Sequence, residues 1–346
     1  MSFVSITTWR ITGETETLQH VTELMKRKYF PGLLALGAKH SMLMDAELDR
    51  FAIVTVYPSR QVRDDALAHI SDLRREGAEE FGAELMDAAP RLRLICIAAT
   101  GTNNVDLDAA RERGIAVTNV TGYGTRSVVQ HVFAILLGWA TRLWEQHQAV
   151  RAGDWSRGTH FCLLGEDFDQ PMRELAGLRL GIVGHGELGQ AVARAAEAFG
   201  MEVLLAERPG ASPRPGRLPL HALLPRVDVL SLHCPLTDAT RNLIGAAELA
   251  LMRPDALLIN TARGGIVDEQ ALADALRAGT IGAAAVDTLT SEPPPPYHPL
   301  LAADIPNLIV TPHAAWASRE SRQRLVDGVA ENIRAFIAGG SRNRVA

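Results

Sequence analysis

The sequence predicts an α/β protein in which a doubly wound parallel sheet is joined to a second, smaller α/β domain. From residue 176 onward, short apolar runs alternate with segments of helical periodicity, which is the pattern of a parallel sheet covered on both faces. The first of these runs leads directly into a glycine-rich turn and a helix. The chain has 346 residues, which suits two domains of ordinary size.

The elements of the sheet follow one another along the chain. Apolar runs of strand length lie at residues 178–183, 201–206, 227–232, 256–260, 281–286 and 308–310. Their continuous apolar character indicates strands that are buried on both faces. Between them, residues 188–199 are periodic and rich in alanine, and residues 268–278 are followed by Gly279, so both segments predict helices.

Further elements lie on either side of this sheet. Upstream, residues 92–98 and 115–118 have strand character, and residues 127–150 predict one long helix. The turn-rich residues 121–124 indicate a hinge. Downstream, residues 318–338 predict an amphipathic helix.

Composition argues against several kinds of protein. The formal net charge is -5, with 35 basic and 40 acidic residues, so no charge excess suggests nucleic acid or an anionic membrane as a partner. Cys96, Cys162 and Cys234 are odd in number and far apart, which argues against a disulfide framework and a metal site. No signal-peptide pattern begins the chain, and its most apolar run is about half a membrane span. We therefore expect a cytoplasmic protein.

Gly184, Gly186 and Gly189 form a G-x-G-x-x-G pattern between a predicted strand and a predicted helix. In a Rossmann-type domain the first glycine makes the tight turn, the second lets the backbone approach a pyrophosphate, and the third lets the helix pack on the strand. The pyrophosphate then lies at the positive end of the helix. The flanking elements make the pattern a predicted dinucleotide site.

Glu207 ends the next strand. An acid about 20 residues after such a fingerprint accepts hydrogen bonds from the ribose hydroxyls and repels a 2'-phosphate. This residue therefore favours NAD as the cofactor. Its neighbour Arg208 could host a 2'-phosphate, so NADP stays open.

Arg263, Glu292 and His313 each follow one of the last predicted strands, at the sheet edge where open α/β sheets bind ligands. A guanidinium can hold a carboxylate and polarise a carbonyl oxygen. A histidine can donate a proton near neutral pH, and a carboxylate can orient it and stabilise its charged form. Each residue alone has an ordinary structural explanation. Together they predict the reduction of a 2-oxo acid, with hydride transferred from a nicotinamide.

Several segments of residues 83–338 resemble the D-isomer-specific 2-hydroxyacid dehydrogenase family. They are residues 98–106, the glycine fingerprint, residues 232–237, residues 260–268 and residues 311–313. Within that family the chain is most similar to glycerate dehydrogenase and hydroxypyruvate reductase. The segments that carry this likeness are residues 119–123 with 129–131, residues 292–295 and residues 313–318.

This resemblance implies roles for individual residues. It implies that Arg263 binds substrate, that His313 is the acid and base, and that Glu292 is its partner. Backbone amides at Thr100 and Gly101 would help to hold the substrate carboxylate. The cofactor contacts that it implies are Glu187 and Leu188 under the pyrophosphate, Thr261 and Ala262 near the nicotinamide, and Asp287 on the carboxamide. It also implies a homodimer that pairs through the cofactor domain.

The resemblance implies a cofactor domain at residues 123–316 and a substrate domain formed by residues 1–122 and 317–346. The first 82 residues depart from the family pattern. They predict a strand, a helix, two strands and a helix, at residues 3–11, 16–29, 38–44, 51–57 and 61–81. This order is weakly similar to the ferredoxin-like fold of antibiotic-biosynthesis monooxygenases. The alternative is a divergent half of the substrate domain.

Three functions are consistent with the sequence. The first is an enzyme that reduces hydroxypyruvate or glyoxylate, or oxidises D-glycerate. The second is a non-catalytic NAD sensor, although a sensor would need only the fingerprint and not the triad of Arg263, Glu292 and His313. The third places a separate activity in the N-terminal segment. A chain that begins near Gly82 would test this third function, because normal turnover would make the N-terminal segment an accessory.

Overall fold

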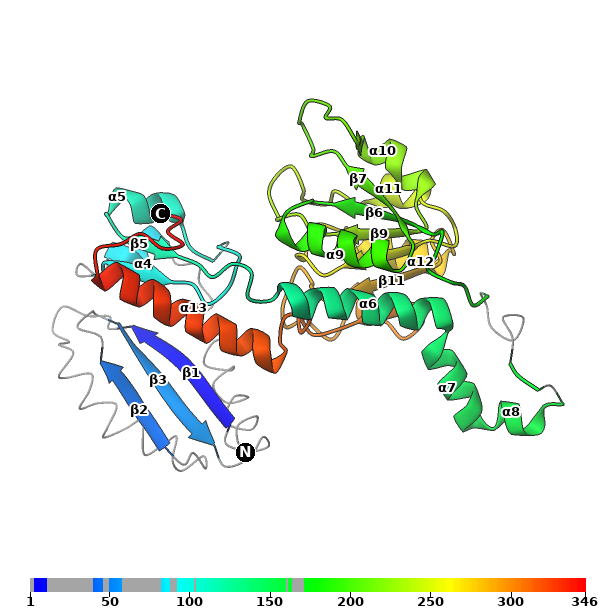
Figure 1. The fold of residues 1–346 in the computed structure, drawn as a ribbon, viewed down its shortest axis with the longest axis horizontal. Coiled ribbons are helices and arrows are strands. Elements are labelled where there is room, and N and C mark those ends of the chain that lie inside the picture. The colour runs from blue at the N-terminus through cyan, green and yellow to red at the C-terminus, as the bar shows by residue number, and fades with distance from the viewer. Residues whose placement is uncertain are drawn as a thin grey trace. The chain divides into compact units, whose positions relative to one another are not determined.

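The computed structural model describes residues 3–10, 40–45, 50–57, 82–87, 92–102, 104–159, 161–163 and 171–346 (Figure 1). The chain divides into two compact units. The larger is Gly122–Leu325, and the smaller combines Met1–Thr121 with Val326–Ala346.

The larger unit contains a seven-stranded sheet of order β12-β11-β10-β9-β6-β7-β8. The strands are β6 (Arg179–Val183), β7 (Glu202–Ala206), β8 (Arg217–Leu218), β9 (Val229–Leu232), β10 (Leu257–Asn260), β11 (Ala283–Val286) and β12 (Leu308–Val310). Every pair is parallel. The strand order reverses between β6 and β9, which is the switch point of a doubly wound sheet. The predicted fold class is therefore confirmed.

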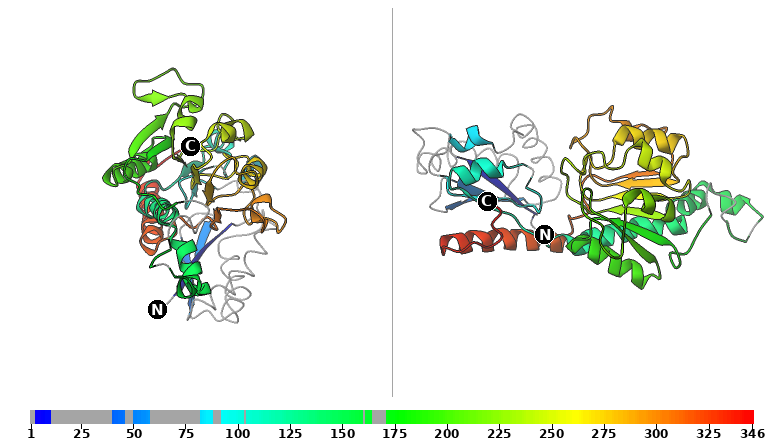
Figure 2. Two further views of the ribbon diagram at one scale, coloured as in Figure 1. Left: turned by 90° about the vertical axis from the view of Figure 1, so that its right-hand side faces the viewer. Right: turned by 90° about the horizontal axis from the view of Figure 1, so that it is seen from above.

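Helices cover both faces of this sheet (Figure 2). Successive side chains of a strand point to opposite faces. Accordingly, Leu230 of β9 belongs to a core that also contains Leu249 and Leu272, from α11 (Ala246–Leu251) and α12 (Glu269–Arg277). Val229 belongs to the opposite core, with Val192 of α9 (Glu187–Ala198) and residues of α6 (Thr125–Thr141). Burial on both faces explains the continuous apolar runs in the sequence.

The single helix predicted at residues 127–150 is wrong. Two helices, α6 and α7 (Leu143–Ala152), meet at Arg142, whose φ of 53° is left-handed. The ring of Trp144 packs so closely on α6 that a Cβ at Gly138 would lie 2.1 Å from it. The buried guanidinium of Arg142 lies 3.2 Å from Glu145. Helical periodicity continues through the bend, so the pattern gave no sign of it.

Several short elements were not predicted, because segments this short show no periodicity. They are α8 (Asp154–Arg157), β8, α10 (Leu220–Leu223), α11, and the 3₁₀ turns η3 (Leu224–Arg226) and η4 (Pro299–Leu301). Together α7 and α8 extend away from the sheet of the larger unit (Figure 1).

In the smaller unit, β4 (Leu94–Cys96) pairs in parallel with β5 (Ala116–Thr118), which confirms the strands predicted there. Helices α4 (Ala83–Asp87) and α5 (Leu107–Glu112) contribute Met86 and Ala110 to its core. The end of α13 (Arg319–Ile337) lies against the segment that follows β5. Its buried Asn332 donates a hydrogen bond of 2.8 Å to the carbonyl of Asn119.

A separate three-stranded sheet has the order β1-β3-β2, and both of its pairs are antiparallel. Its strands are β1 (Phe3–Arg10), β2 (His40–Asp45) and β3 (Arg50–Tyr57), close to the predicted bounds. The helices predicted at residues 16–29 and 61–81 lie outside the described residues. An antiparallel sheet is compatible with the ferredoxin-like order of elements. That interpretation of the N-terminal segment stays a prediction.

Candidate active site

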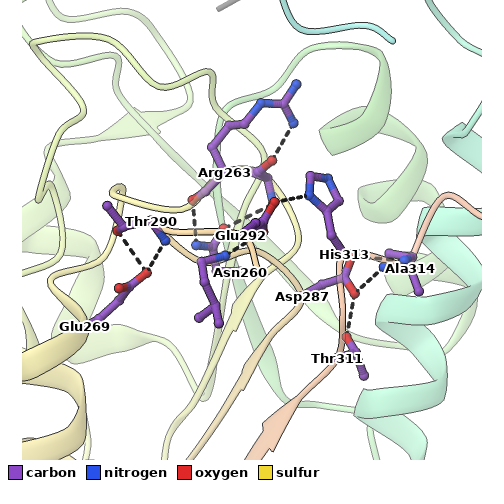
Figure 3. Close-up of polar contacts among 12 residues, drawn as sticks. Asn260, Arg263, Glu269, Asp287, Thr290, Glu292, Thr311, His313 and Ala314 are labelled. Atoms are coloured by element: carbon purple, nitrogen blue, oxygen red, sulfur yellow. Dashed lines mark hydrogen bonds and ion pairs between the residues drawn. The ribbon is translucent and has the colours of Figure 1, made fainter. Parts of the chain in front are cut away.

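Three loops meet beyond the carboxyl ends of β10, β11 and β12 and carry the predicted chemical residues (Figure 3). Parallel strands in register end at the same edge, so the loops that follow them lie side by side. Arg263 follows β10, Glu292 follows β11 and His313 follows β12. The structure therefore brings the three together as the sequence predicts.

Glu292 and His313 form a hydrogen-bonded pair. His313 Nδ1 lies 2.7 Å from Glu292 Oε2, which leaves Nε2 as the ring nitrogen that can serve a substrate. Oε1 of the same carboxylate accepts a hydrogen bond of 2.8 Å from the Leu289 N–H. The backbone of His313 has a φ of 50°, a conformation that costs free energy and recurs at functional sites. Its N–H is held by the carbonyl of Asp287 at 2.8 Å.

Each member of this pair stabilises the charged form of the other. The hydrogen bond to Glu292 is the main reason that the pKa of His313 is raised from 6.5, and it outweighs burial, which lowers that pKa. For Glu292, burial is the largest influence and raises the pKa. Hydrogen bonds from His313 and Leu289, with the nearby positive charges, outweigh burial and lower the pKa overall. The site therefore favours the imidazolium form of His313 and the ionised form of Glu292 more than water does.

Arg263 projects from a turn that the buried side chain of Asn260 organises. The Asn260 amide accepts a hydrogen bond from the Ala262 N–H at 3.1 Å and donates one to the Arg263 carbonyl at 2.8 Å. The charge of Arg263 lowers the pKa values of both Glu292 and His313. Its guanidinium is thus within electrostatic reach of the pair. Sequence reasoning quoted Asn260 as part of a motif but gave it no role.

The carboxylate of Asp287 accepts hydrogen bonds from other residues of the protein. Its Oδ1 accepts hydrogen bonds from the Thr311 hydroxyl at 2.5 Å and the Ala314 N–H at 2.9 Å, and its Oδ2 accepts one from the Ala315 N–H at 2.9 Å. The side chain is 1% exposed. These bonds fold the loop that carries His313, a role that sequence reasoning did not assign. Its predicted contact with the carboxamide of the cofactor stays a prediction.

The glycine loop between β6 and α9 has the geometry of a pyrophosphate cradle. Gly184 has a φ of 94°, and a Cβ on it would lie 2.5 Å from the Cys234 nitrogen. A Cβ on Gly189 would lie 2.1 Å from the Gly184 carbonyl oxygen. A Cβ on Gly186 would meet no atom within 4 Å. Gly184 and Gly189 therefore allow close packing of the backbone, and Gly186 faces the open space that a phosphate requires.

Other residues near this loop also suit a dinucleotide. The Glu187 carboxylate accepts a hydrogen bond of 2.7 Å from the Thr125 hydroxyl, and Leu188 packs against the core. The first turn of α9 therefore offers backbone amides to an anion. Ala262 and Thr261 are both buried, and the Thr261 hydroxyl has no hydrogen-bond partner among the described residues. A buried hydroxyl of this kind can bond to a ligand.

Comparisons with known proteins identify the family. The model described as "D-isomer specific 2-hydroxyacid dehydrogenase, NAD binding domain" matches residues 133–315. A glycerate dehydrogenase of Methylorubrum extorquens is 45% identical over 263 residues, which are 76% of this chain and 82% of the relative. The chain belongs to the D-isomer specific 2-hydroxyacid dehydrogenase family. The predicted resemblance is therefore confirmed.

Other relatives and solved structures agree. A hydroxypyruvate reductase of Blautia hydrogenotrophica is 37% identical, covering 76% of this chain and 81% of the relative. The TT0316 protein of Thermus thermophilus is 41% identical with a TM-score of 0.68, covering 78% of this chain and 83% of that structure. A glyoxylate/hydroxypyruvate reductase of Sinorhizobium meliloti, solved with NADP and malonate, is 33% identical with a TM-score of 0.67, covering 78% and 82%.

This 2-hydroxyacid dehydrogenase is an oxidoreductase with an NAD-binding domain, as predicted. Within the described residues no group of His, Cys, Asp and Glu could hold a metal ion, and no helix there is long and apolar enough to cross a membrane.

The dehydrogenase has a cavity of about 390 Å³ beside the end of β7, next to the glycine loop. Glu207 lies in its wall with a side chain that is only 10% exposed. Hydrogen bonds from the Arg214 guanidinium, at 2.8 Å from Nε, are the main reason that the pKa of Glu207 falls to about 2. The Arg208 and Arg214 backbone amides also bond to this carboxylate. Sequence reasoning missed Arg214, which lies across a loop without periodicity.

Thr100 and Gly101 belong to the smaller unit of the dehydrogenase. The Thr100 hydroxyl donates a hydrogen bond of 3.0 Å to the Val120 carbonyl, and the Asn119 amide donates one of 2.7 Å to the Thr100 carbonyl. These bonds fix the turn after β4. The contact of their backbone amides with a substrate carboxylate stays a prediction.

Replacing Glu207 with alanine tests the assigned ribose contact. Without the carboxylate, a 2'-phosphate is no longer repelled and Arg214 is released to bind it. We expect the ratio of NADPH to NADH affinity to rise about tenfold, the size of one charge-assisted hydrogen bond. The measurement is a fluorescence titration with each cofactor. The matched control is Arg214→Ala, which keeps the acid and should keep the preference for NADH. An unchanged ratio in Glu207→Ala would refute the contact.

Proposed function

We propose that this dehydrogenase reduces hydroxypyruvate or glyoxylate, or oxidises D-glycerate, with Arg263, Glu292 and His313 as its chemical residues. The observation that carries the proposal is the Glu292–His313 hydrogen bond of 2.7 Å within the electrostatic reach of Arg263. The substrate class is supported by relatives named glycerate dehydrogenase, hydroxypyruvate reductase and glyoxylate reductase.

In the proposed reduction, Arg263 binds the substrate carboxylate and polarises the adjacent carbonyl. Backbone amides of Thr100 and Gly101 share the carboxylate. When bound, NADH supplies the hydride that the carbonyl carbon accepts. His313 donates a proton from Nε2 to the carbonyl oxygen, and the product is a 2-hydroxy acid. In the oxidation direction the neutral imidazole accepts that proton.

Glu292 has a defined part in this proposal. It orients the imidazole through Nδ1, and its negative charge stabilises the imidazolium that must be present before reduction. Because Glu292 itself keeps a lowered pKa, it stays ionised while His313 titrates. Proton transfer therefore depends on one group, with the other as a fixed charge.

A non-catalytic NAD sensor is the rival function. The strained left-handed backbone of His313, the buried Asp287 and the Asn260 turn all position groups that a sensor would not need. Such strain costs free energy and is retained where the site requires it. These features favour the enzyme. NAD is the proposed cofactor because Glu207 lies at the end of β7, and we expect the enzyme to act in the cytoplasm.

We further propose that two copies of the chain pair through α7 and α8. Among the described residues these helices bury none of their own side chains. Large apolar side chains on and beside them are exposed, namely Leu137, Leu143, Trp144, Val150, Trp155, Phe161 and Met172. An apolar surface of this kind marks an interaction site. A second copy of the chain suits this surface because α7 and α8 of one copy, which we call the arm, can cover the arm of the other copy in an isologous dimer.

The first test is turnover of NADH with a panel of 2-oxo acids, using the native chain and His313→Ala. We expect the native enzyme to prefer hydroxypyruvate and glyoxylate. His313→Ala should lower kcat by about 10²- to 10⁴-fold, the usual contribution of general acid catalysis, while the Kd for NADH changes less than about twofold because the imidazole serves the substrate. NADH binding without any turnover by the native chain would favour the sensor.

A second test is the pH dependence of kcat/KM in Glu292→Gln. In the native enzyme His313 has a raised pKa, so reduction should persist above pH 6.5 and fall as the pH rises through that raised pKa. Glutamine preserves the size of the side chain but removes the charge, and burial and Arg263 then lower the pKa of His313. The falling limb of the pH profile of kcat/KM should therefore move to lower pH. A limb that stays in place would contradict the pairing of Glu292 with His313.

A third test is the mass of the chain in solution, by sedimentation velocity. The native protein should sediment as a dimer. Leu143→Asp combined with Trp155→Asp should give monomers, because two charges would then oppose burial of the arm. Leu251→Asp, at an exposed leucine of α11, is the matched control and should stay dimeric. A monomeric native chain would overturn the proposal.

A further inference from the structure

A buried hydrogen-bonded pair lies next to the loop of Glu292 and takes no part in the mechanism above. His298 Nε2 is 2.9 Å from Glu269 Oε2, and the two side chains are 6% and 13% exposed. A buried carboxylate is costly unless hydrogen bonds satisfy it. His298 Nδ1 accepts a hydrogen bond of 3.2 Å from the Leu300 N–H, so Nε2 is the ring nitrogen that donates to Glu269.

The second oxygen of Glu269 is also satisfied by hydrogen bonds. Oε1 accepts hydrogen bonds from the Thr290 N–H at 2.6 Å and from the Thr290 hydroxyl at 2.9 Å (Figure 3). Glu269 is the first residue of α12, directly after the N-cap Asp268. The helix therefore binds the loop after β11 through a single carboxylate.

The backbone of residues 289–290 lies between two glutamates. The Leu289 N–H donates to Glu292 and the next N–H, of Thr290, donates to Glu269. Behind this peptide, the loop of Arg263 approaches so closely that a Cβ on Gly264 would lie 2.0 Å from the Leu289 carbonyl carbon. The peptide is thus fixed from both sides, and its position sets that of the Glu292 carboxylate.

We propose that Glu269, held by His298, is a positioning residue that sets the Glu292 carboxylate against His313. This inference rests on the proposed function, because it acts through the Glu292–His313 pair. We call the set Glu269, His298 and Thr290 the clamp. The clamp touches neither substrate nor cofactor in this proposal and acts through the Leu289 N–H that bonds to Glu292.

The clamp has a measurable consequence for proton transfer. The groups that set the titration of His313 are Glu292 and Asp287, which favour its charged form, and Arg263, which opposes it. Asp287 also lies on the loop after β11, but its carboxylate is held separately by Thr311, Ala314 and Ala315, so Glu292 is the group whose position depends on the clamp. If the loop moves, the hydrogen bond to Glu292 lengthens, and burial and Arg263 then lower the pKa of His313. Misplacement of a catalytic group by about 1 Å can cost up to about 100-fold in rate.

A structural role alone would give a different result. An acid in the first turn of a helix stabilises that helix through its dipole, so loss of Glu269 would lower stability in any case. The chain offers a matched control in the same region. Arg277 of α12 donates a hydrogen bond of 2.7 Å to Asp304, beyond η4. Arg277→Ala removes a bond between α12 and that segment without touching residues 289–290.

The experiment measures kcat, KM, the pH profile of kcat/KM and the NADH Kd for Glu269→Ala, Glu269→Gln, Thr290→Val and Arg277→Ala. We expect Glu269→Ala to lower kcat about tenfold or more and to move the limb to lower pH, with the NADH Kd unchanged. Glu269→Gln should recover part of both effects, because its oxygen can still accept from Thr290. Thr290→Val, an exposed change that keeps the backbone bond, should give a smaller shift in the same direction.

Two outcomes would overturn the clamp. One is a pH limb that stays in place in both Glu269→Ala and Thr290→Val. The other is the same shift in Arg277→Ala. Glu292→Gln distinguishes this failure from failure of the proposed function. If Glu292→Gln moves the limb and the clamp variants do not, only the clamp is wrong. If Glu292→Gln also leaves the limb in place, the proposed roles of the pair are wrong.

Discussion

The site depends on one constraint, which is that β10, β11 and β12 are parallel neighbours in register. Their side chains pack into apolar cores on both faces of the sheet, so a slip in register would expose apolar groups to water. The strand ends are consequently fixed by the core and not by the polar groups at the edge. The loops that follow the strands therefore begin side by side. This places a guanidinium, a carboxylate and an imidazole from distant parts of the sequence at the same edge of the sheet.

Much of this arrangement could be predicted from the sequence. Continuous apolar runs fixed the sheet, and the chemistry of Arg263, Glu292 and His313 followed from their places after strands. What could not be predicted depends on contacts between loops that lack periodicity. Arg214 reaches Glu207 across such a loop. Helical periodicity likewise continued through Arg142, where packing of Trp144 on Gly138 turns the backbone.

Asp287 shows a second kind of limit. Family resemblance predicts a contact with the cofactor, which stays a prediction, and gave no sign of the three hydrogen bonds that its carboxylate accepts from the loop of His313. A residue type and its position in a motif do not reveal where its hydrogen bonds go, because that depends on backbone amides brought near by the fold. The same holds for Glu269, which sequence reasoning placed only at a helix start.

The four prolines at residues 293–296 separate Glu292 from His298. Each proline ring fixes its φ at about −65°, so the run is stiff, and it ends in a turn in which the His298 N–H donates a hydrogen bond of 2.9 Å to the Pro295 carbonyl. The run therefore sets the spacing along the chain between the carboxylate that orients His313 and the buried His298. Loss or gain of a single residue there would move one of these two side chains out of hydrogen-bond range. This segment should therefore tolerate changes in length less well than other surface loops.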